Sequence, residues 1–253
     1  MLANSAPCHI GILIFPAMTQ MDFSGPYEVL ARLPNTTVHV VAKTLEPVRA
    51  EHGLTLYPTI SIEGCPPLDV IVVPGGPGQQ HLMHDEAVLG FLRRQAGQVK
   101  YVTSVCTGAL VLGAAGLLWS YRATTHWLSL PLLRHFGAIP VDERVVIDRN
   151  RVTAGGVTSG IDFGLHLAAM LRGETIARQI QLQMEYNPAP PFRSGSPSTA
   201  PQDIIETVRL AAEPLQQERS TVARKWQKDW KSRRHPAPMP TEPTGIKLVH
   251  KPA

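Results

Sequence analysis

The sequence predicts an α/β protein in which a mostly parallel β-sheet is covered by helices on both faces. Short apolar runs rich in β-branched residues alternate along the chain with segments of helical periodicity. The runs are apolar at nearly every position, whereas strands that face water on one side are apolar at every second position. Continuous apolar runs that alternate with helices are typical of parallel strands buried on both faces.

The first half of the chain is expected to alternate in this way. Residues 9–15 (HIGILIF) form an apolar strand that Pro16 ends. From Asp22 onward, apolar residues recur at helical spacing as far as Pro34. Two more strands are expected at residues 37–42 and 69–73, and a helix at residues 87–95. The third strand runs into a Pro-Gly-Gly-Pro-Gly turn.

The second half of the chain continues the alternation. A strand at residues 100–105 leads directly into a helix at residues 107–118, and a further helix surrounds residues 127–135. A hairpin that turns at Arg149-Asn150 is expected to pair residues 144–148 with residues 151–154. Two more helices are predicted at residues 159–171 and 175–186.

The C-terminal part differs in composition and is expected to form an extension. We predict an α/β domain over residues 1–192, a connector and an amphipathic helical segment over residues 193–235, and a disordered tail over residues 236–253. The helical segment has two apolar stripes, and Pro214 should kink or interrupt it. The first stripe comprises Ile204, Val208, Ala211 and Leu215, and the second comprises Val222, Trp226 and Trp230.

Composition and charge exclude several classes of protein. The chain of 253 residues has 43% hydrophobic residues, and no apolar run is long enough to cross a membrane. Three cysteines at irregular spacing suit neither a disulfide framework nor a zinc site, so we expect a cytoplasmic protein without metal or cofactor. The net charge of +4 is concentrated in residues 219–234, which hold seven basic side chains and one acidic one. Nucleic-acid binding is not expected of the remainder.

Cys106 is the strongest candidate for a catalytic residue. It lies at the junction between the strand at 100–105 and the following helix, in the sequence Ser-Val-Cys-Thr-Gly. This is the design of a nucleophile elbow, with Cys where hydrolases have Ser. Amides at the start of a helix can lower the pKa of such a thiol by several units, to favour the thiolate. The alternative is a buried structural cysteine.

Asp22 is the candidate general acid or base. It opens a helix, so a structural role as an N-cap or first-turn carboxylate is the alternative. A carboxyl group that faces a thiolate in a desolvated pocket should have a raised pKa and hold a proton near neutral pH. Because Asp22, Gly75-Gly76 and Cys106 each follow a strand, we expect them to meet at the carboxyl edge of the sheet.

Other residues near these positions could bind substrate. The amides of Gly75 and Gly76 could stabilise developing negative charge as an oxyanion hole, and Gly155 and Gly156 could leave room for a ligand. Tight turns are the alternative for both pairs. Thr107 could orient substrate or water with its hydroxyl, or merely bond to backbone in the first turn.

His126, in the segment Thr-Thr-His-Trp at 124–127, could act as a base or as a partner behind the site. A single His after a strand is more often structural.

Together these motifs resemble the ThiJ/PfpI superfamily. The resemblance covers about residues 10–192 and rests on five segments: MDFSGPYEVL at 21–30, SVCTG at 104–108, RATTHW at 122–127, GGVTSGID at 155–162 and QLQMEYNPAPPF at 181–192. It implies a flavodoxin-like fold akin to that of class I glutamine amidotransferases.

Within this superfamily, the pairing of Asp22 with Cys106-Thr107 resembles the isocyanide hydratase branch. The protease-like and chaperone-like branches have Glu near the first helix, and the protease-like branch has His after the nucleophile. The resemblance therefore implies hydration of isocyanides to N-substituted formamides without a cofactor, by a cytoplasmic homodimer. Cys106 would be the nucleophile, Asp22 the general acid and base, and Thr107 a positioning residue.

Three alternatives remain open. The same cysteine could act on glyoxal-type carbonyls. The chain could instead be a redox or ligand sensor, since its Cys-Thr-Gly and Ala-Thr-Thr-His-Trp motifs also resemble the sensor domain of AraC-type regulators. No helix-turn-helix pattern follows, however, in the roughly 60 residues after Pro191. The basic segment at 219–234 could bind nucleic acid, although docking of its Trp stripe with solvated Lys and Arg side chains is the simpler interpretation.

Overall fold

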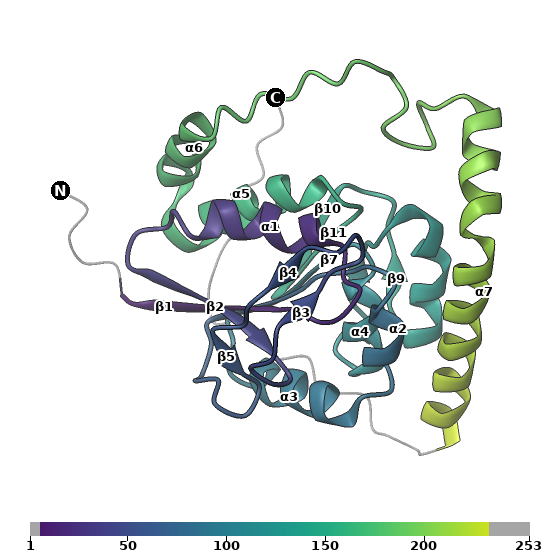
Figure 1. Ribbon diagram of the computed structural model, residues 1–253, viewed down its shortest axis with the longest axis horizontal. Helices are drawn as coiled ribbons and strands as arrows, with labels where there is room; N and C mark the ends of the chain where they lie inside the picture. The colour runs from purple at the N-terminus through teal and green to yellow at the C-terminus, as the bar shows by residue number, and fades with distance from the viewer. Residues whose placement is uncertain (1–5, 233–253) are drawn as a thin grey trace.

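A seven-stranded sheet forms the centre of the computed structural model, which describes residues 6–232 (Figure 1). The strand order is β10-β11-β7-β6-β1-β2-β5. All neighbouring strands are parallel except those of the β10–β11 hairpin, so the predicted sheet is confirmed. The strands are β1 (Cys8–Leu13), β2 (Thr36–Ala42), β5 (Ile60–Ser61), β6 (Val70–Val73), β7 (Tyr101–Val105), β10 (Val145–Asp148) and β11 (Arg151–Ala154).

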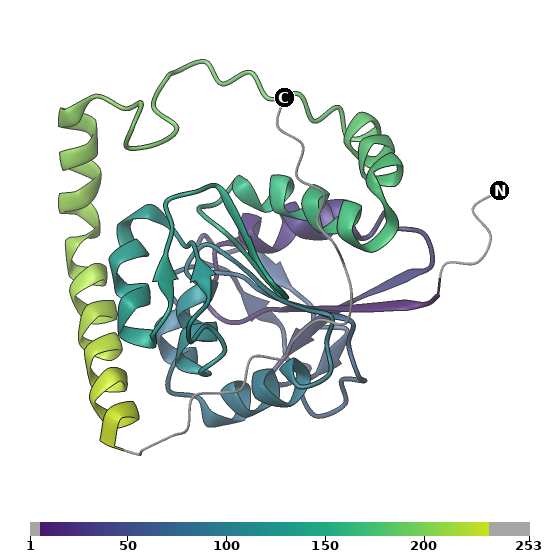
Figure 2. The same ribbon diagram turned by 180° about the vertical axis from the view of Figure 1, so that it is seen from behind.

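Helices cover both faces of this sheet, as predicted. On one face α1 (Gln20–Leu30) packs against α5 (Ser159–Arg172), and α6 (Glu174–Gln183) lies beside α5 (Figures 1 and 2). On the other face lie α3 (Glu86–Ala96) and α4 (Gly108–Ala114). The four residues of β6 are all buried, which explains why that run has no polar positions.

Several small elements connect the layers. They are the short helix α2 (Gln79–Leu82), the ladders β3 (Val48–Arg49) with β4 (Thr55–Leu56) and β8 (Arg122–Ala123) with β9 (Ile139–Pro140), and the 3-10 helix η1 (Trp127–Phe136). The helix expected around residues 127–135 is thus a 3-10 helix, and Pro131 inside it has no N–H to donate to an α-helical ladder. The helix α4 is shorter than predicted because Gly116, at φ +78°, ends the helical conformation.

The C-terminal extension is a single helix, α7 (Gln202–Ser232), which follows an irregular connector and packs along η1 at one side of the molecule (Figure 1). Pro214 does not interrupt it, so the interruption that we allowed for does not occur. A proline inside a helix removes one hydrogen bond, and here contacts between α7 and η1 continue past it, from Gln216 to Trp226. Residues 233–235 of the predicted segment and the predicted disordered tail, residues 236–253, lie outside the described residues.

The face that α7 buries also differs from the predicted first stripe. Ile204 and Val208 are 46% and 43% exposed, and Ala211 is exposed too. The face turned to the body instead carries Gln216, Arg219, Ala223, Trp226 and Trp230, which recur at helical spacing. Two of these five side chains are polar, so hydrophobic periodicity misses this face.

None of the helices within residues 6–232 combines the length and the apolar composition that crossing a bilayer requires.

Candidate active site at Cys106

Cys106 occupies a strained turn between β7 and α4. Its φ is +56°, a left-handed backbone conformation that residues other than glycine adopt at a cost in free energy. Two hydrogen bonds hold this turn: its N–H donates to the carbonyl of Ala154 at 3.0 Å, and its carbonyl accepts from Thr125 Oγ1 at 2.7 Å. Neighbouring segments therefore impose the elbow geometry.

Two glycines allow the loop after β6 to lie against this turn. A Cβ on Gly108 would lie 1.9 Å from the carbonyl oxygen of Val73, and one on Gly75 would lie 2.9 Å from Cys106 Cβ. Both distances are too short for a side chain. The glycines expected at this edge are thus required for close backbone approach to the nucleophile.

Asp22 lies beside the Cys106 thiol, in the first turn of α1. The carboxyl is fully buried, and its Oδ2 accepts a hydrogen bond from the Gly75 amide at 3.1 Å. Its Oδ1 has no hydrogen-bond partner of good geometry within residues 6–232. The N-cap of α1 is Thr19, so Asp22 is not the N-cap but an acidic residue of the first turn, the other position that the structural alternative allowed.

Burial dominates the ionisation of both groups. It raises the pKa of Asp22 to about 7, although the neighbouring thiol and the Gly75 amide lower it. Burial, followed by the negative charge of Asp22, also raises the pKa of Cys106, against the Thr107 amide and Arg219. The expected low pKa of the thiol is therefore wrong, because desolvation outweighs the first amides of α4. Each group makes ionisation of the other harder, so the pair keeps a proton near neutral pH.

The predicted oxyanion donors bind protein groups instead. The Gly76 amide donates to Thr107 Oγ1 at 3.1 Å, and the Gly75 amide donates to Asp22. The two amides thus lie at the candidate site, as expected, but their partners are Asp22 and Thr107. Their hydrogen bonds orient the side chains of Thr107 and Asp22 beside the nucleophile.

His126, Gly155 and Gly156 lie at the border of the site. The Nδ1 of His126 accepts from the Leu128 amide at 3.4 Å and so caps η1. A Cβ on Gly156 would lie 2.6 Å from this ring, so the space beside Gly156 holds His126 and not a ligand, contrary to expectation. The Gly155 amide donates to the carbonyl of Arg144 at 3.0 Å. Burial and then Arg219 lower the pKa of His126, which favours a neutral ring at pH 7.

Comparison with known proteins agrees with this architecture. The sequence model of the DJ-1/PfpI family matches residues 9–170. The chain belongs to the DJ-1/PfpI family. It is 58% identical to an isonitrile hydratase from Pseudomonas putida over 205 residues, which cover 81% of this chain and 90% of that protein.

A solved structure and a regulator extend the comparison. The structure of a ThiJ/PfpI family protein from Pseudomonas syringae is similar, with a TM-score of 0.85 and 42% identity over 86% of this chain and 91% of that one. The chain is also 31% identical to the HTH-type transcriptional regulator GbdR from Pseudomonas aeruginosa over 192 residues. That match covers 72% of this chain and 52% of the regulator.

Arg219 also lies at this candidate site, although the sequence did not single it out. It projects from α7, is only 5% exposed, and donates from Nη2 to the carbonyl of Gly76 at 3.4 Å. We expected the basic residues of this segment to stay solvated, and for Arg219 that expectation is wrong. The available signal was its position seven residues before Trp226 and eleven before Trp230, on the same helical face.

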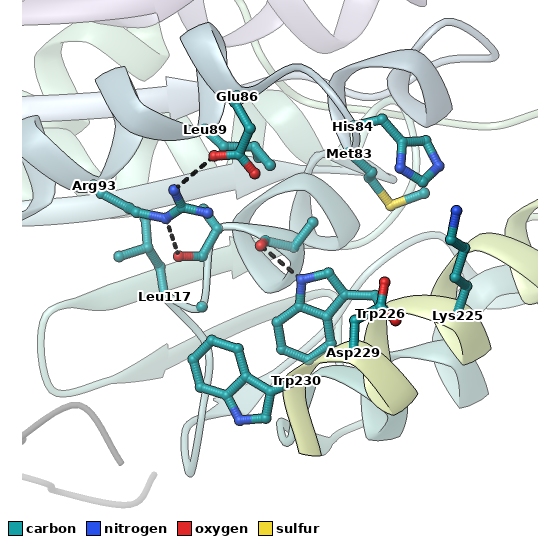
Figure 3. A pocket seen from close by; sticks show the side chains of 13 residues that line it. Met83, His84, Glu86, Leu89, Arg93, Leu117, Lys225, Trp226, Asp229 and Trp230 are labelled. Carbon is teal, nitrogen blue, oxygen red and sulfur yellow. Dashed lines mark hydrogen bonds and ion pairs between the residues drawn. The ribbon is translucent and has the colours of Figure 1, made fainter. Parts of the chain in front are cut away.

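A cleft of about 730 Å³ lies apart from this site, between α3, the end of α4 and the last turns of α7 (Figure 3). None of the candidate site residues lines it. Trp226 Nε1 donates to the carbonyl of Ala114 at 2.9 Å, and the ring of Trp226 stacks on that of Trp230. These contacts anchor the end of α7 to the body.

Within residues 6–232 no group of three or more His, Cys, Asp or Glu side chains could hold a metal ion.

Proposed function

We propose that this protein hydrates isocyanides, R–NC, to N-substituted formamides, with Cys106 as nucleophile and Asp22 as general acid and base. The observation that carries the proposal is a buried carboxyl group with a pKa of about 7 beside a buried thiol. The 58% identity to an isonitrile hydratase over most of both chains supports the reaction class.

In the first step, the Cys106 sulfur attacks the terminal carbon of the isocyanide while Asp22 donates a proton to the same carbon. A C–S bond and a C–H bond form, and the product is a thioimidate, R–N=CH–S–Cys106. The carboxyl of Asp22 is suited to this transfer because burial keeps it protonated at a pH where an exposed aspartate is ionised.

In the second step, water adds to the thioimidate carbon. The Asp22 carboxylate accepts a proton from the water and passes it to the nitrogen, which yields R–NH–CH(OH)–S–Cys106. Collapse of this species breaks the C–S bond, releases R–NH–CHO, and returns the hydroxyl proton to Asp22 and the electron pair to sulfur. Covalent catalysis thus replaces one difficult hydration by two easier additions.

Thr107 is proposed to position the substrate or the attacking water. Its oxygen already accepts the hydrogen bond from the Gly76 amide, which orients the hydroxyl and leaves the hydroxyl proton to donate. Loss of this hydroxyl in Thr107→Val would remove the donor and keep the shape of the side chain.

The test is incubation of the purified protein with cyclohexyl isocyanide and chromatographic measurement of the formamide. We expect turnover by the wild-type chain and at least a thousandfold loss in Cys106→Ala and Cys106→Ser, because the covalent step requires the thiol. Cys65→Ala, at a half-buried cysteine outside the site, is the matched control and should keep full activity. Turnover of methylglyoxal without turnover of the isocyanide would replace the proposal by a glyoxalase. Absence of both activities from folded protein would favour a sensor.

The proposal includes a cytoplasmic homodimer, as the family resemblance implies. All three cysteines are free, which suits a reducing compartment. Apolar side chains at Phe192 and Leu210 are exposed on the surface of the described chain and are available to an interface. Sedimentation equilibrium should give twice the mass of the chain; a monomer would contradict this part of the proposal.

A further inference from the structure

The helix α7 brings a positive charge to Cys106 from the far end of the chain. Arg219 is buried, its Nη2 lies 3.4 Å from the Gly76 carbonyl, and its Nε has no hydrogen-bond partner within residues 6–232. None of the ion pairs found in this part of the chain includes Arg219. A guanidinium buried without a carboxylate partner is costly, so a protein that retains one has a use for its charge.

The position of Arg219 indicates that use. Gly76 accepts from Arg219 through its carbonyl and donates through its amide to Thr107, the residue after the nucleophile. The charge of Arg219 interacts most strongly with Cys106 among the anionic groups that surround it. The guanidinium therefore contacts the loop that lies against the elbow, and its charge acts on the Cys106 sulfur.

We propose that Arg219 is a positioning residue of the active site, whose charge stabilises the thiolate form of Cys106 and whose hydrogen bond holds the Gly76 loop against the elbow. The inference deepens the proposed function, because the thiolate is both the nucleophile of the first step and the leaving group of the last. The neutral thioimidate between them carries no charge on sulfur, so a fixed cation favours the two states in which sulfur is anionic.

The charged groups near Cys106 act on its ionisation in opposite directions. Asp22, on α1, opposes ionisation of Cys106, whereas Arg219, on α7, and the Thr107 amide favour it. Burial and then the charge of Arg219 lower the pKa of His126, before η1, which favours its neutral form. Glu51 lies near both Asp22 and Arg219 and adds negative charge at the border of the site. Arg219 is the cation in this set at pH 7.

Contacts on both sides of Arg219 along α7 hold it in place. One turn before it, Gln216 Oε1 accepts from Ser129 Oγ at 3.0 Å; two turns after it, Trp226 donates to the Ala114 carbonyl (Figure 3). Ala223, between them, is completely buried. The side chain is therefore fixed by helix docking, and a rigidly held charge needs little reorganisation during reaction.

The experiment measures how fast iodoacetamide alkylates Cys106 as a function of pH, by mass spectrometry of the peptide that contains it. Full-length wild type is compared with Arg219→Met, Arg219→Gln and Arg219→Lys. Arg224→Met is the matched control, because Arg224 lies on the same helix and is exposed. Since only the thiolate reacts, loss of the cation should move the profile to higher pH by about one unit and slow alkylation at pH 8 about tenfold.

Arg219→Gln tests the charge in a polar side chain, because its amide keeps an N–H donor but has no charge. We expect Arg219→Gln and Arg219→Met to be slow alike, and Arg219→Lys and Arg224→Met to resemble wild type. A folded Arg219→Gln with the wild-type profile would overturn the electrostatic role. Because alkylation requires no isocyanide, failure of the hydratase assay leaves this test unaffected.

Discussion

At the scale of single residues, the site is defined by competition between Asp22 and Cys106 for a proton. Desolvation penalises both anions, and each anion penalises the other, so the pKa values of both groups are raised. The carboxyl of Asp22 loses its proton first, near pH 7, and in the proposed reactive form the one proton that remains on the pair has moved from sulfur to Asp22. Arg219 and the Thr107 amide favour this distribution.

This competition predicts the pH dependence of turnover. Below pH 7 the pair holds two protons and contains no thiolate, so kcat/KM should rise about tenfold per pH unit and level off above about pH 7. A decline should follow only at strongly alkaline pH, where the second proton is lost. In Asp22→Asn the rise near pH 7 should disappear, and the rate should fall by about a hundredfold or more.

Initial rates of formamide formation between pH 5 and pH 10 check this prediction. A wild-type rate that falls as the pH rises through 7 would contradict it, because such a profile requires a thiolate already formed at lower pH. Cys65→Ala serves as the control and should reproduce the wild-type profile.

At the scale of secondary-structure elements, α7 and the loop after β6 complete the site. The loop supplies two amides that hold Asp22 and Thr107. The helix supplies Arg219, and its own attachment depends on aromatic packing: Trp226 contacts Phe136 of η1 and stacks on Trp230. The C-terminal helix thus contributes a side chain to the candidate site in addition to covering the domain.

Removal of the Trp226 side chain, which attaches α7 to the body, should lower both the stability and the activity of the protein. Trp226→Ala loses the ring contacts and the hydrogen bond to Ala114, and we expect the free energy of unfolding to fall by about 2–4 kcal/mol. Activity should fall as well, because Arg219 lies two turns away on the same face. Urea denaturation and the formamide assay measure the two effects.

The matched control is Leu210→Ala on the same helix, since Leu210 is 68% exposed. Its free energy of unfolding should change by less than about 0.5 kcal/mol. Equal stability of Trp226→Ala and Leu210→Ala would show that α7 is not anchored through Trp226.

At the scale of the whole molecule, the parallel sheet brings the site together. The strands β1, β6 and β7 are neighbours in the sheet, and the segments that follow them carry Asp22, Gly75 and Cys106. Parallel strands present their carboxyl ends at one edge, so these segments meet although they are far apart in sequence. The same assembly buries a carboxyl group, and this affects the stability of the whole fold.

Asp22 makes stability depend on pH in a direction that can be measured. Its pKa is about 7 in the folded protein against an ordinary value of 3.8, so the folded state binds more protons between these values. The stability contributed by the protonated carboxyl is complete below pH 4 and is lost as the pH rises through 7, by up to about 4 kcal/mol. Asp22→Asn should therefore equal wild type at pH 4 and exceed it in stability at pH 8.

Urea denaturation of both proteins at the two pH values checks this expectation. Asp85→Asn is the control, because the pKa of Asp85 is lowered in the folded protein whereas that of Asp22 is raised. Burial raises the pKa of Asp85, but Lys43 and the amides of Val88 and Ala87 lower it overall, so this variant should lose stability at pH 8. A difference between Asp22→Asn and wild type that does not change with pH would contradict the assignment.

Much of the fold could be predicted because its signals are local. Apolar runs at residues 9–15, 37–42, 69–73 and 100–105 correspond to strands of the sheet, and the hairpin around Arg149-Asn150 is antiparallel as expected. Errors occurred where context overrides local preference. Pro214 lies within a continuous helix, and the expected helix around residues 127–135 is a 3-10 helix.

The sequence by itself determined the sheet and the candidate pair Cys106 and Asp22, since periodicity, glycine turns and the strand-to-helix elbow are properties of short segments. The family followed from the resemblance of its motifs to those of known proteins. Only the tertiary structure decided the direction of the Cys106 pKa, the partners of the Gly75 and Gly76 amides and the entry of Arg219 into the site. The physical reason is that ionisation depends on burial and on charges from distant segments. Hydrogen-bond partners likewise depend on which backbones meet. Neither is encoded in the residues on either side of Cys106.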